Sequence, residues 1–119
     1  MTLFAQRSSE TIVIPNGASV SGVIDLTNTA MLGFVTPDAW TTAALNIEVS
    51  NDGTNWSSAY DSYGSQVGSV ATPIVASRYA VDVTSMLPWV YARFRSGTSA
   101  SPVTQGAERT FKVIKRFLA

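Results

Sequence analysis

The side chains of this sequence that could perform chemistry are mainly carboxylates. The 119 residues include no histidine and no cysteine, so the most common general base, the most common zinc ligand and every thiolate are absent. Glu48 and Asp52 are close enough in the sequence to be considered as the carboxylate pair of a glycosidase. Asp52, however, precedes Gly53 and fits a turn, while Glu48 falls on the polar, solvent-facing side of an alternating strand. We therefore expect that the protein is not an enzyme.

Cofactors and metals are not expected either. Gly97 and Gly106 are not followed by the Gly-Lys-Ser or Gly-Lys-Thr sequence of a phosphate-binding loop. Asp61 and Asp82 could bind calcium together with loop carbonyls, but the regular spacing of a calcium-binding loop is missing. The sequence thus predicts no catalytic, cofactor-binding or metal-binding residues.

The formal charges of the chain cancel, with 8 basic and 8 acidic residues. No general electrostatic field would therefore attract nucleic acid or an anionic membrane surface. No apolar segment approaches the roughly 18 residues that span a bilayer, and residues 1–10 do not resemble a secretory signal. We expect a protein that is made in the cytoplasm and binds neither nucleic acid nor membranes.

Four basic residues nevertheless lie near the end of the chain: Arg109, Lys112, Lys115 and Arg116. Together with Arg93 and Arg95 they could form a phosphate-binding patch. The zero net charge and the lack of alternating aromatic residues favour a solvated strand face or a contact with a complementary protein surface. We expect these four residues to belong to a protein interface.

Three aromatic residues, Trp56, Tyr60 and Tyr63, are candidates for glycan binding, because aromatic rings bury the apolar faces of sugars well. Trp56 also follows Asp52-Gly53, a strong signal for a tight hairpin turn, and a cross-strand tryptophan beside such a turn stabilises the hairpin. We favour this structural role for Trp56 and keep glycan binding as the alternative.

Alternation of apolar and polar residues with a period of two dominates the chain and predicts β-strands. In residues 43–50, this pattern directs Asn46 and Glu48 to solvent. In residues 18–26, it directs Gly22 to the core and Ser21 to solvent. The expected strands are residues 10–15, 18–26, 31–37, 43–50, 56–60, 77–83, 89–96 and 109–119, and residues 84–89 could form a single helical turn.

About seven or eight short strands joined by turns favour an all-β fold, in which two half-polar sheets bury their apolar faces against each other. We expect a two-sheet antiparallel sandwich of the jelly-roll kind that forms a single domain over residues 1–119.

Two family resemblances carry further expectations. The segments "IEVSNDGTNW", "SRYAVDV" and "WVYARFRS" resemble the discoidin-like, galactose-binding jelly rolls over about half of the chain. The chain is short for that family and lacks its usual cysteines. This resemblance implies a carbohydrate-binding jelly roll on a fibre or tail, with Trp56, Tyr60 and Tyr63 contacting the glycan.

The second resemblance covers nearly the whole chain. The segments "IPNGASVSGVIDL", "TPDAW", "EVSNDGTNWSSAYDSYG", "VASRYAVDV" and "LPWVYARFRSGTSASPVTQGAERTFKVI" resemble small structural proteins of tailed bacteriophages. This resemblance implies a virion protein made in the host cytoplasm. We expect a capsid decoration or cement protein, in the form of a homotrimer that stabilises the major capsid protein shell. A head-to-tail or tail adaptor is a further alternative.

The start of the chain and one long loop are expected to make contacts with other subunits. Leu3 and Phe4 are apolar residues that a neighbouring subunit could cover, so residues 1–8 are predicted to act as a docking arm. The loop of residues 96–108 is predicted to be a contact surface, since long loops without secondary structure are usually functional or disordered.

Overall fold

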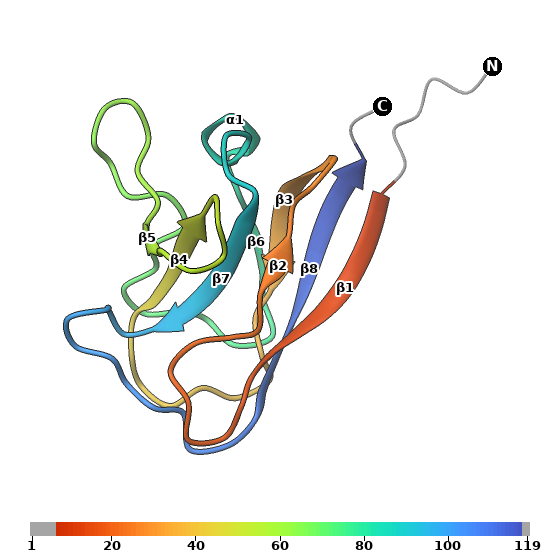
Figure 1. The fold of residues 1–119 in the computed structure, drawn as a ribbon. Helices are drawn as coiled ribbons and strands as arrows, with labels where there is room; N and C mark the ends of the chain where they lie inside the picture. The colour runs from red at the N-terminus through yellow and green to blue at the C-terminus, as the bar shows by residue number, and fades with distance from the viewer. Residues whose placement is uncertain (1–6, 118–119) are drawn as a thin grey trace.

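Two antiparallel sheets pack face to face in the computed structural model, which describes residues 7–117 (Figure 1). The first, sheet A, has the order β1-β8-β3-β6, and the second, sheet B, has the order β2-β7-β4-β5. Sheet A consists of β1 (Arg7–Ile14), β8 (Arg109–Phe117), β3 (Thr29–Val35) and β6 (Arg78–Ala80). Sheet B consists of β2 (Ile24–Asp25), β7 (Tyr91–Ser96), β4 (Leu45–Ser50) and β5 (Ser57–Ser58).

The expectation of an all-β fold built as a two-sheet antiparallel sandwich is confirmed. The helical turn α1 (Val83–Met86) lies between β6 and β7, one residue earlier than the predicted turn. Asp82 caps it, because its carboxylate accepts a hydrogen bond from the Thr84 amide at 3.2 Å. This turn is much too short to cross a membrane, and no other helix of residues 7–117 can do so.

Three phenylalanine rings join the two sheets. Phe94 of β7 and Phe111 of β8 stack with their ring centroids 4.1 Å apart, and both are completely buried. Phe34 of β3 meets Phe94 edge to face at 4.9 Å. Offset and edge-to-face contacts of this kind add about 0.5 to 1.5 kcal/mol to the burial of the rings. The core is therefore centred where β7 crosses β8.

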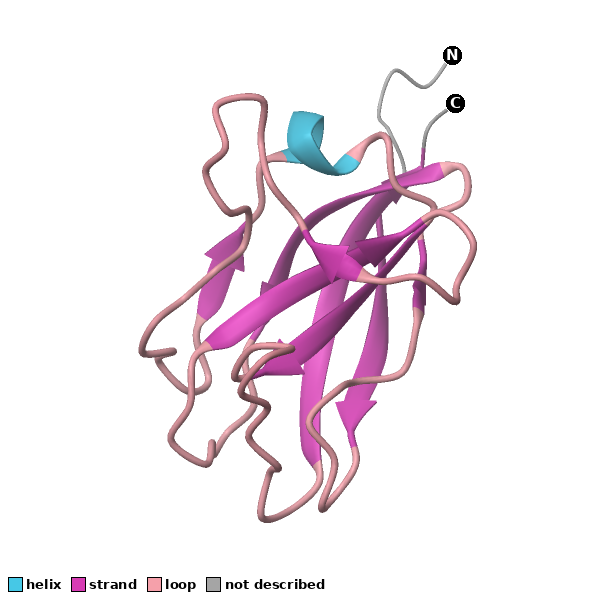
Figure 2. Ribbon diagram, turned by 60° about the vertical axis from the view of Figure 1, so that its left-hand side comes forward, coloured by secondary structure: helices cyan, strands magenta, loops and turns pink. Residues whose placement is uncertain are grey.

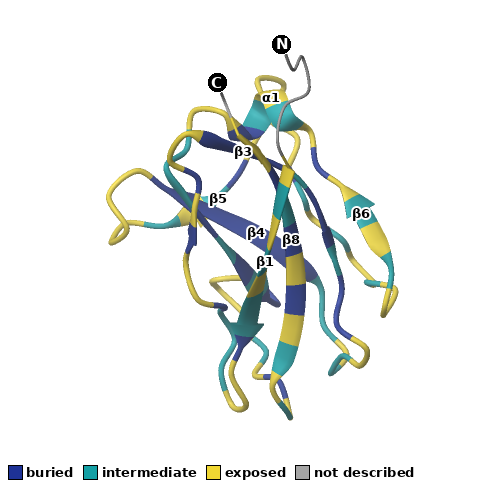
Figure 3. Cartoon of the chain, turned by 90° about the vertical axis from the view of Figure 1, so that its right-hand side faces the viewer, coloured by how far each residue is buried: buried dark blue, intermediate teal, exposed yellow. Residues whose placement is uncertain are grey.

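The alternation read from the sequence is preserved in β7 and β8, which are inner strands of the two sheets. Phe111 and Val113 of β8 are buried, whereas Lys112 between them is exposed, and Figure 3 shows this strand banded accordingly. In β7 the same pattern buries Ala92 and Phe94. These strands bury only one side chain in two because each packs against the opposite sheet with one face.

Residues 18–26 do not form the single strand that the alternation predicts. Only Ile24 and Asp25 pair as β2, and at Ser21 and Gly22 the predicted faces are reversed, with Ser21 buried and Gly22 exposed. Ser21 is drawn inward because its hydroxyl accepts a hydrogen bond from the Phe94 amide at 2.9 Å. The Ser21 hydroxyl here takes the place of a backbone carbonyl as the acceptor for the Phe94 amide. A pattern of apolar and polar residues cannot reveal this substitution.

A second correction concerns the predicted tight hairpin at Asp52-Gly53. The strand pairing ends at Val49 and Ser57, so the connection is a wider loop that includes residues 51–56. Gly53 does have a positive φ of 76°, as the turn signal requires. The Asp52 carboxylate organises the loop by accepting hydrogen bonds from the amides of Thr54 and Asn55, both at 2.8 Å. The hydrogen bonds of an Asx turn thus close a loop that is longer than the predicted hairpin turn.

The loops at one end of the sandwich, drawn in pink in Figure 2, are held together by Gln105. This residue is 1% exposed. Its amide nitrogen donates to the Ser96 hydroxyl at 2.7 Å, and its amide oxygen accepts from the Thr41 amide at 2.9 Å and from Arg109 Nε at 3.0 Å. Its backbone carbonyl accepts from the Gly17 amide at 2.9 Å. The predicted contact loop of residues 96–108 is therefore anchored to its own chain.

We predict that Gln105→Leu lowers the free energy of unfolding by about 2 to 4 kcal/mol, because the buried Ser96 and the half-buried Thr41 and Arg109 lose hydrogen bonds while the side-chain volume changes little. Chemical denaturation measures this change. Thr104→Ala, at an exposed neighbouring position, should alter stability by less than about 0.5 kcal/mol. Equal stability of Gln105→Leu and the unaltered protein would contradict this role for Gln105.

Candidate functional site

The outer face of sheet A, onto which Figure 3 looks, carries the candidate site. Two adjoining hollows of about 440 Å³ and 650 Å³ lie on this face and share Val35 of β3 and Lys112 of β8. We call their combined surface the outer groove. Its lining residues are Thr11, Leu32, Gly33, Phe34, Val35, Thr36, Pro37, Asp38, Arg78, Tyr79, Ala80, Ala39, Glu108, Arg109, Thr110, Lys112 and Ile114.

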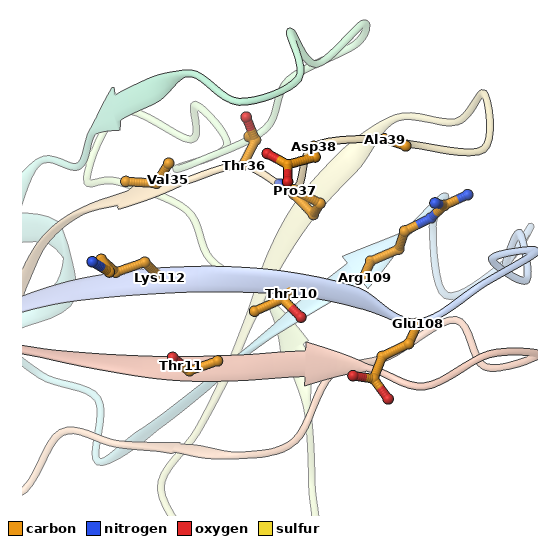
Figure 4. Close-up of a pocket in the computed structure, with 10 residues that line it drawn as sticks. All are labelled: Thr11, Val35, Thr36, Pro37, Asp38, Ala39, Glu108, Arg109, Thr110 and Lys112. Carbon is orange, nitrogen blue, oxygen red and sulfur yellow. The ribbon is translucent and has the colours of Figure 1, made fainter.

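The strand register places these side chains together. Val35 of β3 lies opposite Lys112 of β8, which in turn lies opposite Thr11 of β1. On the other side, Val35 pairs with Arg78 of β6. Because facing residues on neighbouring antiparallel strands point to the same side of a sheet, these four side chains form one row across the outer face. The close-up of the smaller hollow shows Thr11, Lys112 and Val35 on three adjacent strands (Figure 4).

Gly33 lets β6 complete the floor of the outer groove. A Cβ atom at this position would lie 2.5 Å from the Tyr79 carbonyl oxygen, which is closer than real structures allow. Gly33 pairs with Ala80, so the missing side chain permits β6 to approach β3. The half-buried Val35 and Ile114 then lie in an apolar floor between the strands.

Charged residues of both signs border this apolar floor. Arg78 and Lys112 are exposed on one part of the groove, and Asp38 and Glu108 are exposed at its other end. The three ion pairs found within residues 7–117 involve none of these four groups. An apolar centre with an exposed charged rim is typical of a surface that contacts another protein.

The basic cluster predicted near the end of the chain is divided between the two faces of β8. Lys112 and Arg116 are exposed, whereas Lys115 is 9% exposed and points into the sandwich. The Lys115 ammonium donates to the Asp25 carbonyl at 3.0 Å and lies 3.1 Å from Glu10 Oε1. The expectation of one four-residue patch is therefore corrected, since alternate residues of a strand face opposite sides.

Arg109 also differs from its predicted role as a free interface cation. Its guanidinium is bound within the chain by Gln105 and by the Thr41 hydroxyl, the latter at 3.1 Å. Figure 4 shows Arg109 and Lys112 extending in opposite directions along β8. Lys112 is thus the predicted interface residue that the structure places in the outer groove with its charge exposed. Leu3 and Phe4, the predicted docking-arm residues, lie outside the described residues.

A second polar cluster covers the outer face of sheet B. The Glu48 side chain, predicted to face solvent, is only 3% exposed and lies between Arg93 and Arg95. Arg93 Nε donates to one carboxylate oxygen of Glu48 at 2.8 Å, and Arg95 Nε donates to the other at 3.1 Å. Both guanidinium groups sit over β4 and exclude water from the carboxylate. Sequence spacing misses this cluster because the three residues come from two paired strands.

Asn46, the other β4 residue predicted to face solvent, is also buried, at 4% exposure. Its side-chain oxygen accepts hydrogen bonds from Gln66 Nε2 at 2.9 Å and from the Ser69 hydroxyl at 2.8 Å. The segment that carries these donors bridges back to β4 through Val70 and Leu45. The face that the alternation marks as wet is thus covered by a loop of the same chain.

Trp56 belongs to this polar cluster. The Arg93 guanidinium carbon lies 4.3 Å from the centre of the Trp56 ring, and Trp56 Nε1 donates to the Gly53 carbonyl at 3.3 Å. One face of the ring is therefore occupied by a cation. Tyr60 and Tyr63 are more accessible, at 55% and 94% exposure. The three predicted glycan-contacting residues thus differ: two are open to solvent, and Trp56 is engaged in holding the loop.

Comparison with known proteins relates the chain to one solved fold. No protein-family model matches it, and no curated protein matches its sequence. The chain is similar in structure to SPBc2 prophage-derived protein YomS, with a TM-score of 0.57 and 10% sequence identity. The match covers 98% of this chain and 99% of that protein. At this low identity, the likeness shows a shared fold.

We predict that Glu48→Gln lowers the free energy of unfolding by about 2 to 3 kcal/mol, because Arg93 and Arg95 remain half-buried without their counter-charge. Denaturant titration measures the loss. Glu108→Gln, which removes an exposed carboxylate, is the matched control and should change stability by less than about 0.5 kcal/mol. Equal effects of the two substitutions would show that the Glu48 ion pairs contribute nothing specific.

The Asp52 loop gives a prediction about pH. Hydrogen bonds from the Asn55 and Thr54 amides hold the pKa of the Asp52 carboxyl well below its ordinary value of 3.8. A lowered folded-state pKa stabilises the fold above the ordinary pKa, and this contribution disappears as the pH falls towards the folded-state pKa. Between about pH 4 and pH 2, Asp52→Asn should therefore lose less stability than the unaltered protein, as measured by urea denaturation. Identical pH dependence in the two proteins would contradict this prediction.

Proposed function

We propose that this protein is a structural component of a bacteriophage particle and that it attaches to another virion protein through the outer groove. The observation that carries the proposal is an exposed sheet face with an apolar floor at Val35 and Ile114 and a charged rim. Such a face is suited to docking on a protein surface. The phage connection is supported by the resemblance to phage structural proteins and by the fold shared with a prophage-derived protein.

The more specific proposal is a capsid decoration or cement protein that stabilises the major capsid shell as a homotrimer in the virion. Two sheets of four antiparallel strands, in which every pair of neighbours except β4 and β5 is non-consecutive in sequence, support the jelly-roll assignment. Jelly rolls are common in viral capsid proteins. A head-to-tail or tail adaptor would use the same groove at a different place in the particle.

The attachment surface can be tested by reversing one charge. Lys112→Glu changes an exposed side chain that lines both hollows, so we expect weaker binding to particles that lack the native protein, with an unchanged melting temperature. Ser99→Glu introduces the same charge in the loop after β7 and should bind like the unaltered protein. Binding is measured by co-sedimentation with particles, and cryo-electron microscopy locates the bound protein. Full binding of Lys112→Glu to the particles would show that the outer groove is not the attachment surface.

A carbohydrate-binding role is the second candidate, favoured by the exposure of Tyr63 and Tyr60 beside the Trp56 loop. Tyr63→Ala is the informative variant, because its side chain is 94% exposed and its loss should not affect folding. Trp56→Ala is less informative, because a loss of ligand binding could not be separated from the effect of losing the Arg93 contact. A glycan-array signal that Tyr63→Ala abolishes would support this role, and the absence of any glycan signal would exclude it.

A further inference from the structure

The free edge of β1 is a second feature that could join this protein to another molecule. Each sheet of a sandwich has two edge strands, and here the edges are β1 and β6 in sheet A and β2 and β5 in sheet B. Three of them are only 2 or 3 residues long, whereas β1 has 8 residues. Short edge strands protect a protein from unwanted strand pairing, and a long edge strand presents a template for it.

The backbone groups that β1 leaves free can be identified from its hydrogen bonds. The Val13 carbonyl accepts a hydrogen bond from the Gly22 amide at 3.1 Å, so the backbone groups of Val13 point away from β8. Residues two apart in a regular strand point their backbone groups the same way. The pairing of β1 with β8 is regular, so the amides and carbonyls of Arg7, Ser9 and Thr11 also point outward. Within residues 7–117, none of these outward groups has a backbone partner.

We propose that the occupant of this edge is a second copy of the chain, whose β1 pairs antiparallel with the first β1 around a two-fold axis at Ser9. In this register Ser9 faces Ser9 of the second copy, and Arg7 faces Thr11 in both directions. The pairing forms about six backbone hydrogen bonds and merges the two copies of sheet A into one continuous sheet. Such an interface is isologous and closes with two copies.

Charge and the number of hydrogen bonds together select this register over its neighbours. A shift that centres the pair on Glu10 places two carboxylates directly opposite each other, and a shift that centres it on Arg7 opposes two guanidinium groups. Shifts that centre the pair on Ser8 or Thr11 oppose no like charges, but they form only about four backbone hydrogen bonds among residues 7–13. Like charges directly opposite on paired strands are destabilising. One register of β1 against itself therefore combines the largest number of hydrogen bonds with no like charges directly opposite, which is the reason for choosing a second copy over an unrelated strand.

The inference is independent of the proposed virion role and uses a different surface from the outer groove. The homotrimer of the proposed function would have to form through a different interface, because a two-fold strand pairing cannot close around three subunits. The contact is small, so the dimer should form in a concentration-dependent way.

Sedimentation of the full chain over a range of concentrations tests the dimer, with two matched substitutions at Ser9. Ser9→Pro removes the outward amide without removing a bond to β8, and we expect it to remain monomeric at every concentration. Ser9→Ala keeps the amide and should dimerise like the unaltered protein. A monomer at all concentrations for the unaltered protein, or a dimer for Ser9→Pro, would overturn the proposal.

Single cysteines test the register, and the chain has no cysteine of its own. Facing residues in a hydrogen-bonded pair have Cα atoms about 5.5 Å apart, which suits a disulfide. Ser9→Cys should therefore form a covalent dimer on oxidation with oxidised glutathione. Thr11→Cys should not, because the two Thr11 positions are separated by roughly 13 Å along the strands. Crosslinking of Thr11→Cys, or no crosslinking of Ser9→Cys, would overturn the proposed register.

Discussion

The stack of Phe94 on Phe111 is the contact on which the arrangement of this protein depends, because it joins β7, an inner strand of one sheet, to β8, an inner strand of the other. Burial of these rings fixes which face of β7 and β8 points inward. The opposite faces are fixed as a consequence: Lys112 comes to the surface of sheet A, and Arg93 and Arg95 come to the surface of sheet B. The outer groove and the Glu48 cluster are therefore both results of how one pair of aromatic rings packs.

The two outer faces serve different purposes although both are rich in polar residues. On sheet B, Arg93 and Arg95 are used internally by Glu48, and Asn46 is covered by its own loop. On sheet A, the charges that border Val35 have no ionic partner within residues 7–117. Charged groups that already pair within the chain contribute little to binding another protein. Exposed charges around an apolar floor, in contrast, can orient a bound partner. This contrast is why the outer groove is the stronger candidate for attachment.

The sequence predicted the parts of this structure that depend on local periodicity. The alternation of Phe111, Lys112 and Val113 places these residues correctly, and Gly53 has the positive φ that its turn signal indicates. The predictions were wrong where a distant partner changes the outcome. Glu48 is buried because arginines from the neighbouring strand cover it, and Ser21 turns inward to accept a hydrogen bond from Phe94. The outer groove could not be predicted, since its row of side chains depends on the register of four strands.

The pairing of Arg7 with Arg116 has a practical consequence, because it brings the first described residues of β1 beside the last of β8. Neighbouring strands are separated by about 5 Å, so a short glycine-serine linker could connect these positions. The sandwich could then be reopened elsewhere as a circular permutant, for example at the exposed Ser62-Tyr63 bond. The same geometry means that peptides fused before β1 and after β8 would emerge side by side, which makes the fold a scaffold for presenting two sequences at one point.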